Sequence, residues 1–526
     1  MSNRVDEVPV LVVGAGPVGL AMSLMLSRHG VASTTIDKRS EISPLPRARG
    51  VHARAMEILR VCGVEPDLRA AELPITPGAV FLPRLDTLPS RIMRIGSAEA
   101  DEISPSEGLA ISQDIFEGIL SQHARRREQA QLLRGVQLTS FVTDDSGVLA
   151  SVLDTATGTR RHVRARYLIA ADGAASGIRR QLGIRMQGPG DVGQRVSIWF
   201  RADLTRWTGT RPMGIYQLQD SGAVLIWTHQ DHRWTVVTMP GATDTDPTEV
   251  VRTAIGVTDL HVEIQGTSRW TATAQWAPTN HVGPVFLIGD AAHRYPPAGA
   301  TGISTGIADA QNLAWKMAAV LGGRSGADLL TTYDTERTSV AHRNAVEMLG
   351  LWYQFTGAQQ PAHNAPLRSM RQVDMGYQYR SDITLDDGSA DADPPGTDYV
   401  PTAAPGCRAP HIWVDGRPRG RSSIDLFSTD FTLLCGPAGS ATWTRAVDTA
   451  RTDLGVPVTA VRVTNPSWEP LYGVRGSGAV LVRPDGHIAW RHPDTADPTT
   501  AARTLTDALA RAVGRTPTVA ERRNSD

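Results

Sequence analysis

The feature that most constrains the fold of this 526-residue chain is a glycine-rich segment near its N-terminus. A short apolar run, Val8–Val13, precedes Gly14-Ala-Gly16-Pro17-Val-Gly19, and an apolar helix-like segment then leads to a second strand-like run that ends before Asp37. In such a βαβ unit the first glycine permits a tight turn, the second admits a pyrophosphate and the third lets helix and strand pack closely. The terminal acid is placed to bind a ribose hydroxyl. The unit predicts a Rossmann-like α/β domain with a dinucleotide; the alternative is a glycine-rich turn without a ligand.

A second stretch, residues 285–316, repeats the order of strand, acid, loop and helix. Val285–Ile288 is a short unbroken apolar run, as expected for a buried strand, and Asp290 follows it. A helix is expected from about Ser304, and its N-terminus would offer free N–H groups and a positive dipole to an anionic cofactor. The loop between them contains Pro296, Pro297, Gly299 and Gly302, and the helix carries apolar residues at helical spacing, namely Ile307, Ala310, Ala314, Met317 and Leu321.

An arginine-rich segment lies between these two stretches. Arg47 and Arg49 suit a cofactor pyrophosphate, because guanidinium groups form charge-assisted bonds with phosphate. Farther along, Arg54 and Arg60 lie on an amphipathic helix, and the alternative is that they only cover its solvent-exposed face, which we favour for Arg60.

Two further segments carry polar residues at the ends of expected elements. Gln113 stands at a helix start, and Asp172-Gly173 ends a buried strand before a short helix with Arg179. Together the five segments resemble, in their order, the class A FAD-dependent aromatic hydroxylases, which have the para-hydroxybenzoate hydroxylase fold. The resemblance covers roughly residues 8–345. No Trp-x-Trp-x-Ile-Pro segment appears, which argues against the flavin halogenases that share this fold.

The resemblance implies where FAD would bind. The glycine segment and Asp37 would hold the adenosine half, Asp290 the ribityl chain, and Pro297–Gly302 the flavin ring. Ser304 departs from the family, since many relatives carry Asn there. The residues that the resemblance places at the cofactor are Gly14, Gly16, Pro17, Gly19, Asp37, Lys38, Arg47, Arg49, Gln113, Asp172, Gly173, Asp290, Pro297, Gly299, Gly302, Ile303 and Ser304.

The resemblance also implies a reaction. NAD(P)H would reduce FAD, O2 would add to form a flavin hydroperoxide, and its distal oxygen would pass to a phenolic, polycyclic substrate of the aromatic polyketide type. Two alternatives stay open: Baeyer–Villiger oxygen insertion on the same scaffold, or a non-catalytic flavoprotein that sequesters an aromatic intermediate. The sequence names no catalytic base. It does not distinguish NADH from NADPH, because no second dinucleotide motif is present.

Residues 185–280 change in character and predict an antiparallel sheet inserted into the nucleotide domain. Strand-like segments alternate with turns, and residues 73–105 are expected to add a loop or strand to the same pocket. From this region and the nearby loop we select Tyr216, Trp227, Tyr295 and Pro296 as substrate contacts. The alternative for each ring is an ordinary core position. We expect His293 to pack and hydrogen-bond near the cofactor instead of acting as a base.

The last third of the chain predicts a separate unit. Asp386–Pro405 is rich in Asp, Gly, Ala and Pro, as expected for a linker. Residues 406–515 then follow a β/α pattern that includes a hairpin with Asp485-Gly486 at its turn. The order resembles the thioredoxin-like domain of the phenol hydroxylase and aromatic polyketide hydroxylase branch. It has no cysteine pair, which excludes dithiol chemistry.

We therefore expect the following division: a FAD-binding domain in three parts (1–72, 106–184 and 281–345), a substrate domain from 73–105 and 185–280, a helix and linker over 346–405, and a thioredoxin-like domain over 406–526.

Composition narrows the possible partners. The net charge of −1 argues against nucleic acid. The cysteines, Cys62, Cys407 and Cys435, fit no metal spacing and are simplest to explain in a reducing cytoplasm. No apolar run reaches the roughly 18–20 residues that span a membrane. We expect a cytoplasmic monomer or homodimer that binds no metal.

Overall fold

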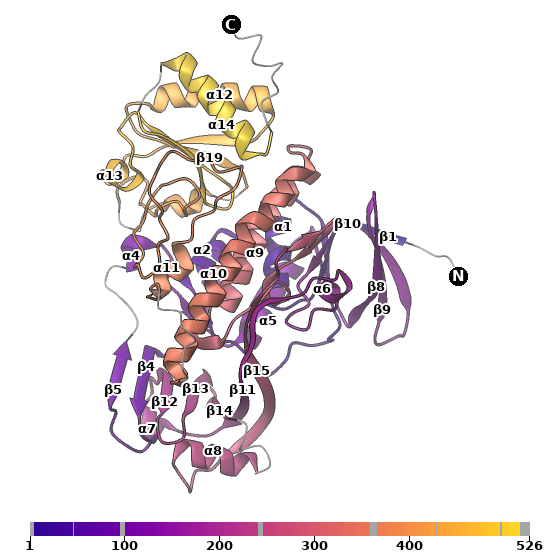
Figure 1. Cartoon of the computed structure of the whole chain (residues 1–526), viewed down its shortest axis with the longest axis vertical. Coiled ribbons are helices and arrows are strands. Elements are labelled where there is room, and N and C mark those ends of the chain that lie inside the picture. The colour runs from indigo at the N-terminus through magenta and orange to yellow at the C-terminus, as the bar shows by residue number, and fades with distance from the viewer. Residues whose placement is uncertain are drawn as a thin grey trace.

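The computed structural model of the chain describes residues 5–45, 47–94, 100–239, 246–357, 366–417, 419–427, 429–494 and 497–515. Residues 95–99, 240–245, 358–365 and 516–526, which fall in four of the expected domain segments, lie outside the described residues. Figure 1 shows three bodies, each built on its own sheet, with the long helix α10 (Thr331–Thr356) running from beside the C-terminal unit to the second sheet.

The first sheet has the order β16-β17-β10-β1-β2-β7, with β8 and β9 paired beside β10. The pairs from β17 to β7 are all parallel. Buried parallel strands require apolar residues on both faces, which explains the unbroken apolar runs in the sequence. The strands are β1 (Val5–Val13), β2 (Ser33–Asp37), β7 (Ala130–Arg134), β8 (Val136–Asp144), β9 (Gly147–Asp154), β10 (Arg160–Ala170), β16 (His281–Val282) and β17 (Val285–Leu287).

Helices α1 (Pro17–Arg28), α5 (Gln113–Arg125) and α9 (Gly302–Leu321) share one apolar core with this sheet. The remaining short elements of this part are β3 (Gly50–Val51), α2 (Ala53–Val61), α3 (Glu65–Ala70), α4 (Ala100–Ile103), β6 (Leu109–Ala110) and α6 (Gly177–Gln181). The Rossmann-like α/β prediction is confirmed.

The second sheet has the order β18-β15-β11-β14-β13-β12-β4-β5, and helix α8 (Pro247–Ile255) packs on one of its faces. Its pairings are antiparallel, as predicted, except that β12 and β4 run parallel. The exception arises because β4 comes from the distant segment 73–105 and not from a neighbouring hairpin. The elements are β4 (Thr76–Leu82), β5 (Arg91–Arg94), β11 (Gln187–Arg201), α7 (Thr205–Thr208), β12 (Met213–Leu218), β13 (Ala223–His229), β14 (Arg233–Thr238), β15 (Glu263–Trp276) and β18 (His293–Arg294).

The expected linker is an ordered strap. After α11 (Met370–Met375) the chain has no helix or strand through residue 405, as the composition predicted. The strap is nevertheless fixed in place: Arg343 and Arg368 both pair with Asp393, at 2.5 and 2.8 Å. Tyr399 is also buried. The composition predicted the lack of helix and strand in this segment but not its packing, because Pro and Gly influence the backbone conformation and not the contacts of the side chains.

The C-terminal unit is a four-stranded sheet of order β20-β19-β21-β22 that carries α12 and α14 on its core. The β19–β20 pair is parallel and the other two pairs are antiparallel, in agreement with the thioredoxin-like prediction. The three cysteines are buried and free. The elements are β19 (Phe431–Cys435), α12 (Ser440–Leu454), β20 (Val458–Arg462), α13 (Trp468–Tyr472), β21 (Ala479–Val482), β22 (Ile488–His492) and α14 (Pro498–Ala512).

Two buried histidines of this unit predict a pH-dependent stability. Burial lowers the pKa of His411 and of His487 from 6.5 to about 4. Below pH 6.5 the unfolded chain therefore binds more protons than the folded chain, and the free energy of unfolding falls as the pH falls. We expect each histidine to contribute a loss of roughly 2 kcal/mol between pH 6.5 and 5. Urea unfolding at both pH values should show a smaller loss in His487→Phe, whereas His261→Gln, at an exposed position, should behave like the parent. Equal losses in all three proteins would contradict the assignment to His487.

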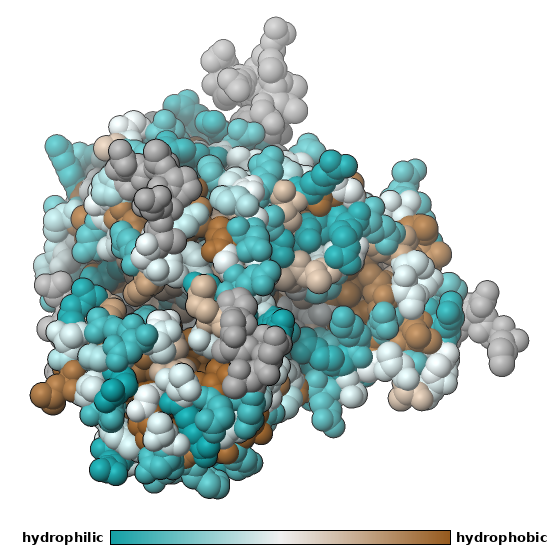
Figure 2. Space-filling view, turned by 60° about the horizontal axis from the view of Figure 1, so that its bottom comes forward, coloured by the Kyte–Doolittle hydropathy of each residue, from teal (hydrophilic) through white to brown (hydrophobic). Residues whose placement is uncertain are grey.

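Figure 2 shows one face of the molecule, where apolar residues lie in separate patches among polar ones. Within the described ranges, no helix is long and apolar enough to cross a membrane. The same residues contain no group of three or more His, Cys, Asp or Glu that could hold a metal ion.

Candidate functional site

The three glycines after β1 have different surroundings. Gly14 adopts a φ of +112°, and a Cβ placed on it would lie 2.2 Å from the carbonyl oxygen of Ala171. A Cβ on Gly19 would lie 1.9 Å from the carbonyl oxygen of Gly14, so this glycine allows α1 to approach the turn. At Gly16, the N-cap of α1, an added Cβ would meet no heavy atom of the described chain within 4 Å. The turn thus leaves open space beside Gly16 and Pro17, at a helix N-terminus without a side-chain cap.

Asp37 ends β2 next to this turn. Its carboxylate is buried and accepts hydrogen bonds from the backbone N–H groups of Ala15 and Arg39, both at 2.8 Å. A carboxylate has about four acceptor positions, so two of them stay available for a ribose hydroxyl. Lys38, the next residue, is exposed.

The side chains of Arg47 and Arg49 have different surroundings in the structure. Gln113 receives the backbone N–H groups of Arg47 and Ala48 on its side-chain oxygen, at 3.3 and 3.1 Å, and so fixes this loop. The Arg49 guanidinium donates to the carbonyl oxygen of Gly214 in β12, and burial lowers the pKa of Arg49 to about 10. Arg47 instead lies near enough to Asp290 to oppose the rise in the Asp290 pKa that the surrounding protein causes. Arg49 therefore ties the loop before β3 to β12 of the second sheet, while Arg47 lies near the loop after β17.

Asp172 lies at the end of β10. One carboxylate oxygen accepts from the N–H groups of Gly177 and Ile178 at the start of α6, and the other is buried without a hydrogen-bond partner in the described chain. Gly173 has a φ of +82°. Arg179 donates to the carbonyl oxygen of Ala291, at 2.9 Å. The segments that carry Asp172 and Asp290 are therefore held together.

The loop after β17 faces the start of α9. The Asp290 carboxylate is exposed, yet the protein around it raises its pKa, against the lowering effects of His293, Arg294 and Arg47. A Cβ on Gly302 would lie 4.0 Å from Asp290 Oδ1, and Ile303 packs partly into the first core. Pro297 is exposed, whereas Gly299 leaves room for Met348, whose Sδ would lie 2.4 Å from an added Cβ.

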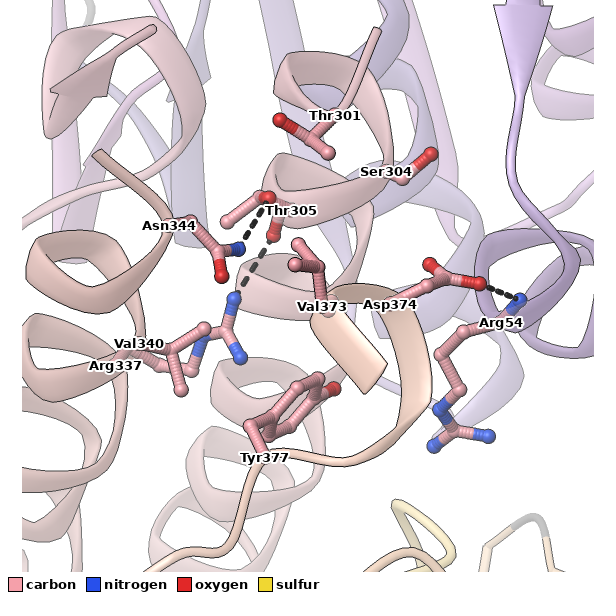
Figure 3. A pocket seen from close by; sticks show the side chains of 11 residues that line it. Arg54, Thr301, Ser304, Thr305, Arg337, Val340, Asn344, Val373, Asp374 and Tyr377 are labelled. Carbon is pink, nitrogen blue, oxygen red and sulfur yellow. Dashed lines mark hydrogen bonds between the residues drawn. The ribbon is translucent and has the colours of Figure 1, made fainter. Parts of the chain in front are cut away.

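Ser304, where the sequence departs from the family, has a contact that the sequence did not predict. Its hydroxyl oxygen accepts the backbone N–H of His52, at 3.0 Å, and so ties the first turn of α9 to the start of α2. Thr301 is the N-cap of α9, and its buried hydroxyl has no partner among the described residues. Figure 3 shows Thr301, Ser304 and Thr305 along the first turn of α9, where they line a small pocket.

A buried network behind the loop was missed by sequence reasoning. The Asp309 carboxylate accepts from Gly289 N–H at 3.0 Å, pairs with His293 Nε2 at 2.7 Å and with Arg337 Nε at 2.7 Å. Burial alone would raise the pKa of Asp309, but Arg337 and His293 lower it to about 2. His293 therefore packs and hydrogen-bonds as expected. The available signal was an aspartate between the apolar residues Ala308 and Ala310 in α9.

The aromatic residues selected as substrate contacts do not share one surface. Tyr216 and Trp227 are 5% and 7% exposed, and both belong to the core between the second sheet and α8. The Tyr216 hydroxyl accepts from Met213 N–H at 3.0 Å. This placement closes both rings to a ligand and corrects the expectation for them. Tyr295 stacks on His293 with ring centroids 4.9 Å apart, and Pro296 is buried.

The opposite face of the second sheet turns toward the part of the chain that is built on the first sheet. Gly266, which pairs with Trp199, lies against the side chain of Leu45, and Arg233 lies 3.5 Å from Asp114 in α5. Because side chains alternate along a strand, the residues on this face are the neighbours of the core residues. They include Ile215, Val224, Ile226, Thr235 and Val237. The Thr235 hydroxyl is buried and has no partner within the described residues.

Two arginines of α2 reach the C-terminal unit. Arg60 pairs with Asp425 at 2.7 Å, and Arg54 is buried and donates to the carbonyl oxygen of Asp485 at 2.7 Å. The idea that they cover a solvent-exposed face was therefore wrong. The pattern of an amphipathic helix marks its polar side but does not reveal that another domain covers it.

These features fit FAD. The open glycine turn, the acid after β2, the unpaired oxygen of Asp172 and the uncapped N-terminus of α9 are the groups that a flavin dinucleotide requires. The family model described as FAD binding domain matches residues 7–347, and that of the C-terminal domain of aromatic-ring hydroxylases matches residues 402–516. The chain belongs to the FAD-dependent aromatic-ring hydroxylases, which are monooxygenases that use FAD and NAD(P)H.

Among its relatives is the tetracenomycin A2 monooxygenase-dioxygenase of Streptomyces glaucescens, 36% identical over 97% of this chain and 98% of that protein. A solved structure of aklavinone-11 hydroxylase with FAD and aklavinone is similar, with a TM-score of 0.86, 32% identity and coverage of 97% of this chain and 100% of that one. The flavin-dependent monooxygenase PieE, solved with FAD and substrate, has a TM-score of 0.88, 30% identity and coverage of 97% and 99%.

Proposed function

We propose that this enzyme hydroxylates a phenolic, polycyclic aromatic compound of the polyketide type, with O2 as the oxygen donor and NAD(P)H as the reductant. The observation that carries the proposal is similarity over nearly the full chain to enzymes named for tetracenomycin A2 and aklavinone. When bound, FAD supplies the activation of O2 after its reduction. The residues of this chain bind and orient the cofactor and the ring and exclude water.

The cofactor is proposed to lie across both halves of the site. The backbone at Gly16 and Pro17 would hold the pyrophosphate, with Asp37 at the adenosine ribose. Asp290 would accept from the ribityl chain, and the residues from Pro297 to Ser304 would contact the flavin ring. The support for this placement is that Gln113, Arg179 and Ser304 already fix these loops to one another in the chain itself.

We place the substrate against the face of the second sheet that carries Ile215, Val224, Ile226, Thr235 and Val237. Four of these five side chains are apolar, and those four are half-buried, as suits a flat aromatic ligand. The unpaired Thr235 hydroxyl could orient a phenol or ketone oxygen. No side chain is proposed as a catalytic base.

Substitution on the two faces of β13 tests this placement. Ile226→Trp adds bulk on the proposed substrate face and is expected to raise the KM for the aromatic substrate at least tenfold without changing the affinity for FAD. That is about 1.4 kcal/mol of lost binding. Trp227→Phe, on the α8 face, is expected to lower the Tm and leave the KM unchanged. A KM that responds to Trp227→Phe and not to Ile226→Trp would reverse the assignment of the faces.

The function itself is tested by a screen of aromatic polyketides for stimulated NAD(P)H and O2 consumption, followed by NMR of the product. A new ring hydroxyl is the expected result. A ring-expanded lactone would instead establish Baeyer–Villiger insertion, which adds the same mass. Tight binding of a ligand without substrate-dependent NAD(P)H consumption would establish the sequestering flavoprotein.

A further inference from the structure

The hairpin turn between β21 and β22 lies buried against the FAD-binding part. Arg483, Asp485 and His487 are 0%, 1% and 1% exposed. A charged turn of the sequence Arg-Pro-Asp-Gly-His normally faces solvent, because buried charges are costly unless they are paired. The turn of the C-terminal unit must therefore be matched by opposite charges on the surface that it meets.

The groups that pair with the charges of this turn lie on α9 and α10. Both terminal nitrogens of Arg483 donate to the Glu336 carboxylate, at 2.6 and 2.9 Å, and Lys316 Nζ donates to the same carboxylate at 2.8 Å. Trp315 and Asn312 of α9 donate to Asp485, at 3.1 and 3.4 Å. Two cations and two carboxylates thus form a closed group without access to solvent.

A second buried ion pair joins the C-terminal unit to α2. Arg408 of the C-terminal unit donates to both oxygens of the Glu57 carboxylate, one of them at 2.9 Å, and Arg54 donates to Glu57 at 2.9 Å. Burial alone would raise the pKa of Glu57, but Arg408 and Arg54 lower it to about 2, so it is charged. Each C-terminal arginine therefore pairs with one buried glutamate of the FAD-binding part, beside a cation from that part.

A short series of contacts links each glutamate to a flavin loop. Glu57 lies in α2. The residue just before this helix, His52, donates its backbone N–H to the Ser304 hydroxyl. Glu336 is followed in α10 by Arg337, which pairs with Asp309, and Asp309 in turn holds Gly289 N–H. Figure 3 shows further contacts of these helices: Arg337 and Asn344 are directed at Thr305, and Asp374 accepts a hydrogen bond from the backbone N–H of Arg54.

We propose that Arg408 and Arg483 are positioning residues of the FAD site, through which the C-terminal unit sets the flavin-facing ends of α2 and α9. A buried charge that loses its partner is strongly destabilising, which favours the arrangement of the C-terminal unit that keeps both glutamates paired. The inference rests on the cofactor placement proposed above. It gives the C-terminal unit, which lacks a cysteine pair, a part in cofactor binding.

The test uses the full-length variants Arg408→Lys and Arg483→Lys, which keep the positive charge but lose the bidentate hydrogen bonds to the glutamate. Arg475→Lys is the matched control, since Arg475 pairs with Asp494 on the surface of the same unit. Apoprotein is titrated with FAD, and the fluorescence and visible absorption of the bound flavin are recorded. We expect both buried variants to bind FAD about tenfold more weakly and with an altered flavin spectrum, and the control to match the parent.

A lowered Tm together with unchanged FAD affinity and spectrum in both buried variants would overturn the inference, because a purely structural role predicts that result. Where Arg408→Lys does not fold, the paired variant Glu57→Gln/Arg408→Gln, in which Arg54 keeps its hydrogen bonds to Gln311 and to the carbonyl oxygen of Asp485, gives the same comparison. Gly16→Val distinguishes a failure of this inference from a failure of the proposed cofactor placement. If it loses FAD while the lysine variants keep full affinity, only the inference fails; if it keeps FAD, the cofactor placement fails.

Discussion

Replacing Gly16 by valine is expected to give a folded apoprotein that no longer retains FAD. The backbone at this position has φ −77° and ψ −175°, which valine adopts readily, and an added Cβ meets no described atom within 4 Å. The new methyl groups would instead fill the open space where the pyrophosphate approaches the backbone. The loss of two hydrogen bonds to charged phosphate costs roughly 3–6 kcal/mol. The Kd for FAD should therefore rise by about 10² to 10⁴.

Gly14→Val is the comparison that makes this result specific. Its Cβ would strike the carbonyl oxygen of Ala171 at 2.2 Å, in a backbone conformation with φ +112° that valine disfavours. This variant should lose both FAD and stability, on the order of 3 kcal/mol in the free energy of unfolding. Fluorescence titration with FAD and urea unfolding of the apoproteins measure the two effects separately. A folded Gly16→Val protein with parental FAD affinity would show that the dinucleotide lies elsewhere.

The glycine turn could be predicted because its information is local. The demands on Gly14 and Gly19 come from backbone a few residues away or on the adjoining strand, and the spacing of the motif records them. The same holds for Asp290 after β17 and for the Asp485-Gly486 hairpin turn, since each follows from a short apolar run and its end.

The substrate face could not be predicted in this way. Alternation along β13 indicates that Leu225 and Trp227 share one face and Ile226 the other, but either face could meet the cofactor. Helix α8, which lies farther along the chain, covers the face that carries Trp227 and so leaves the other face toward the cofactor. Selecting aromatic residues by type favoured Tyr216 and Trp227, and large aromatic rings are also the residues that a sheet core requires.

The contacts between the units had no local signal either. Arg408 and Glu57 are 351 positions apart in sequence, and Arg54 and Arg60 had the spacing of an ordinary polar helix face. Only a complete fold reveals that a second unit lies on that face. A buried charge pair leaves a trace in one sequence only as a charged residue within an apolar helix, as with Lys316 in α9.

Asp290→Ala is expected to weaken FAD binding without unfolding the protein. Among the described residues no hydrogen bond or ion pair involves the exposed Asp290 carboxylate, so its loss should leave the Tm of the apoprotein nearly unchanged. A hydrogen bond to a charged group contributes about 1.5–3 kcal/mol. If Asp290 accepts from the ribityl chain, the Kd for FAD should rise roughly 10- to 150-fold. Asp145→Ala, an exposed aspartate in the β8–β9 turn, is the control and should bind FAD like the parent.

The pH dependence of FAD binding tests whether the charge of the Asp290 carboxylate contributes to the affinity. The surrounding protein raises the pKa of this carboxyl, so protonation weakens it as an acceptor at a higher pH than for an ordinary aspartate. In the parent enzyme the affinity for FAD should fall as the pH is lowered through this raised pKa. Asp290→Asn keeps an acceptor oxygen but cannot titrate, so its affinity should be intermediate at neutral pH and flatter toward acid. If Asp290→Asn retained the slope of the parent, another group would be responsible for it and the assignment of Asp290 to the ribityl chain would lose its support.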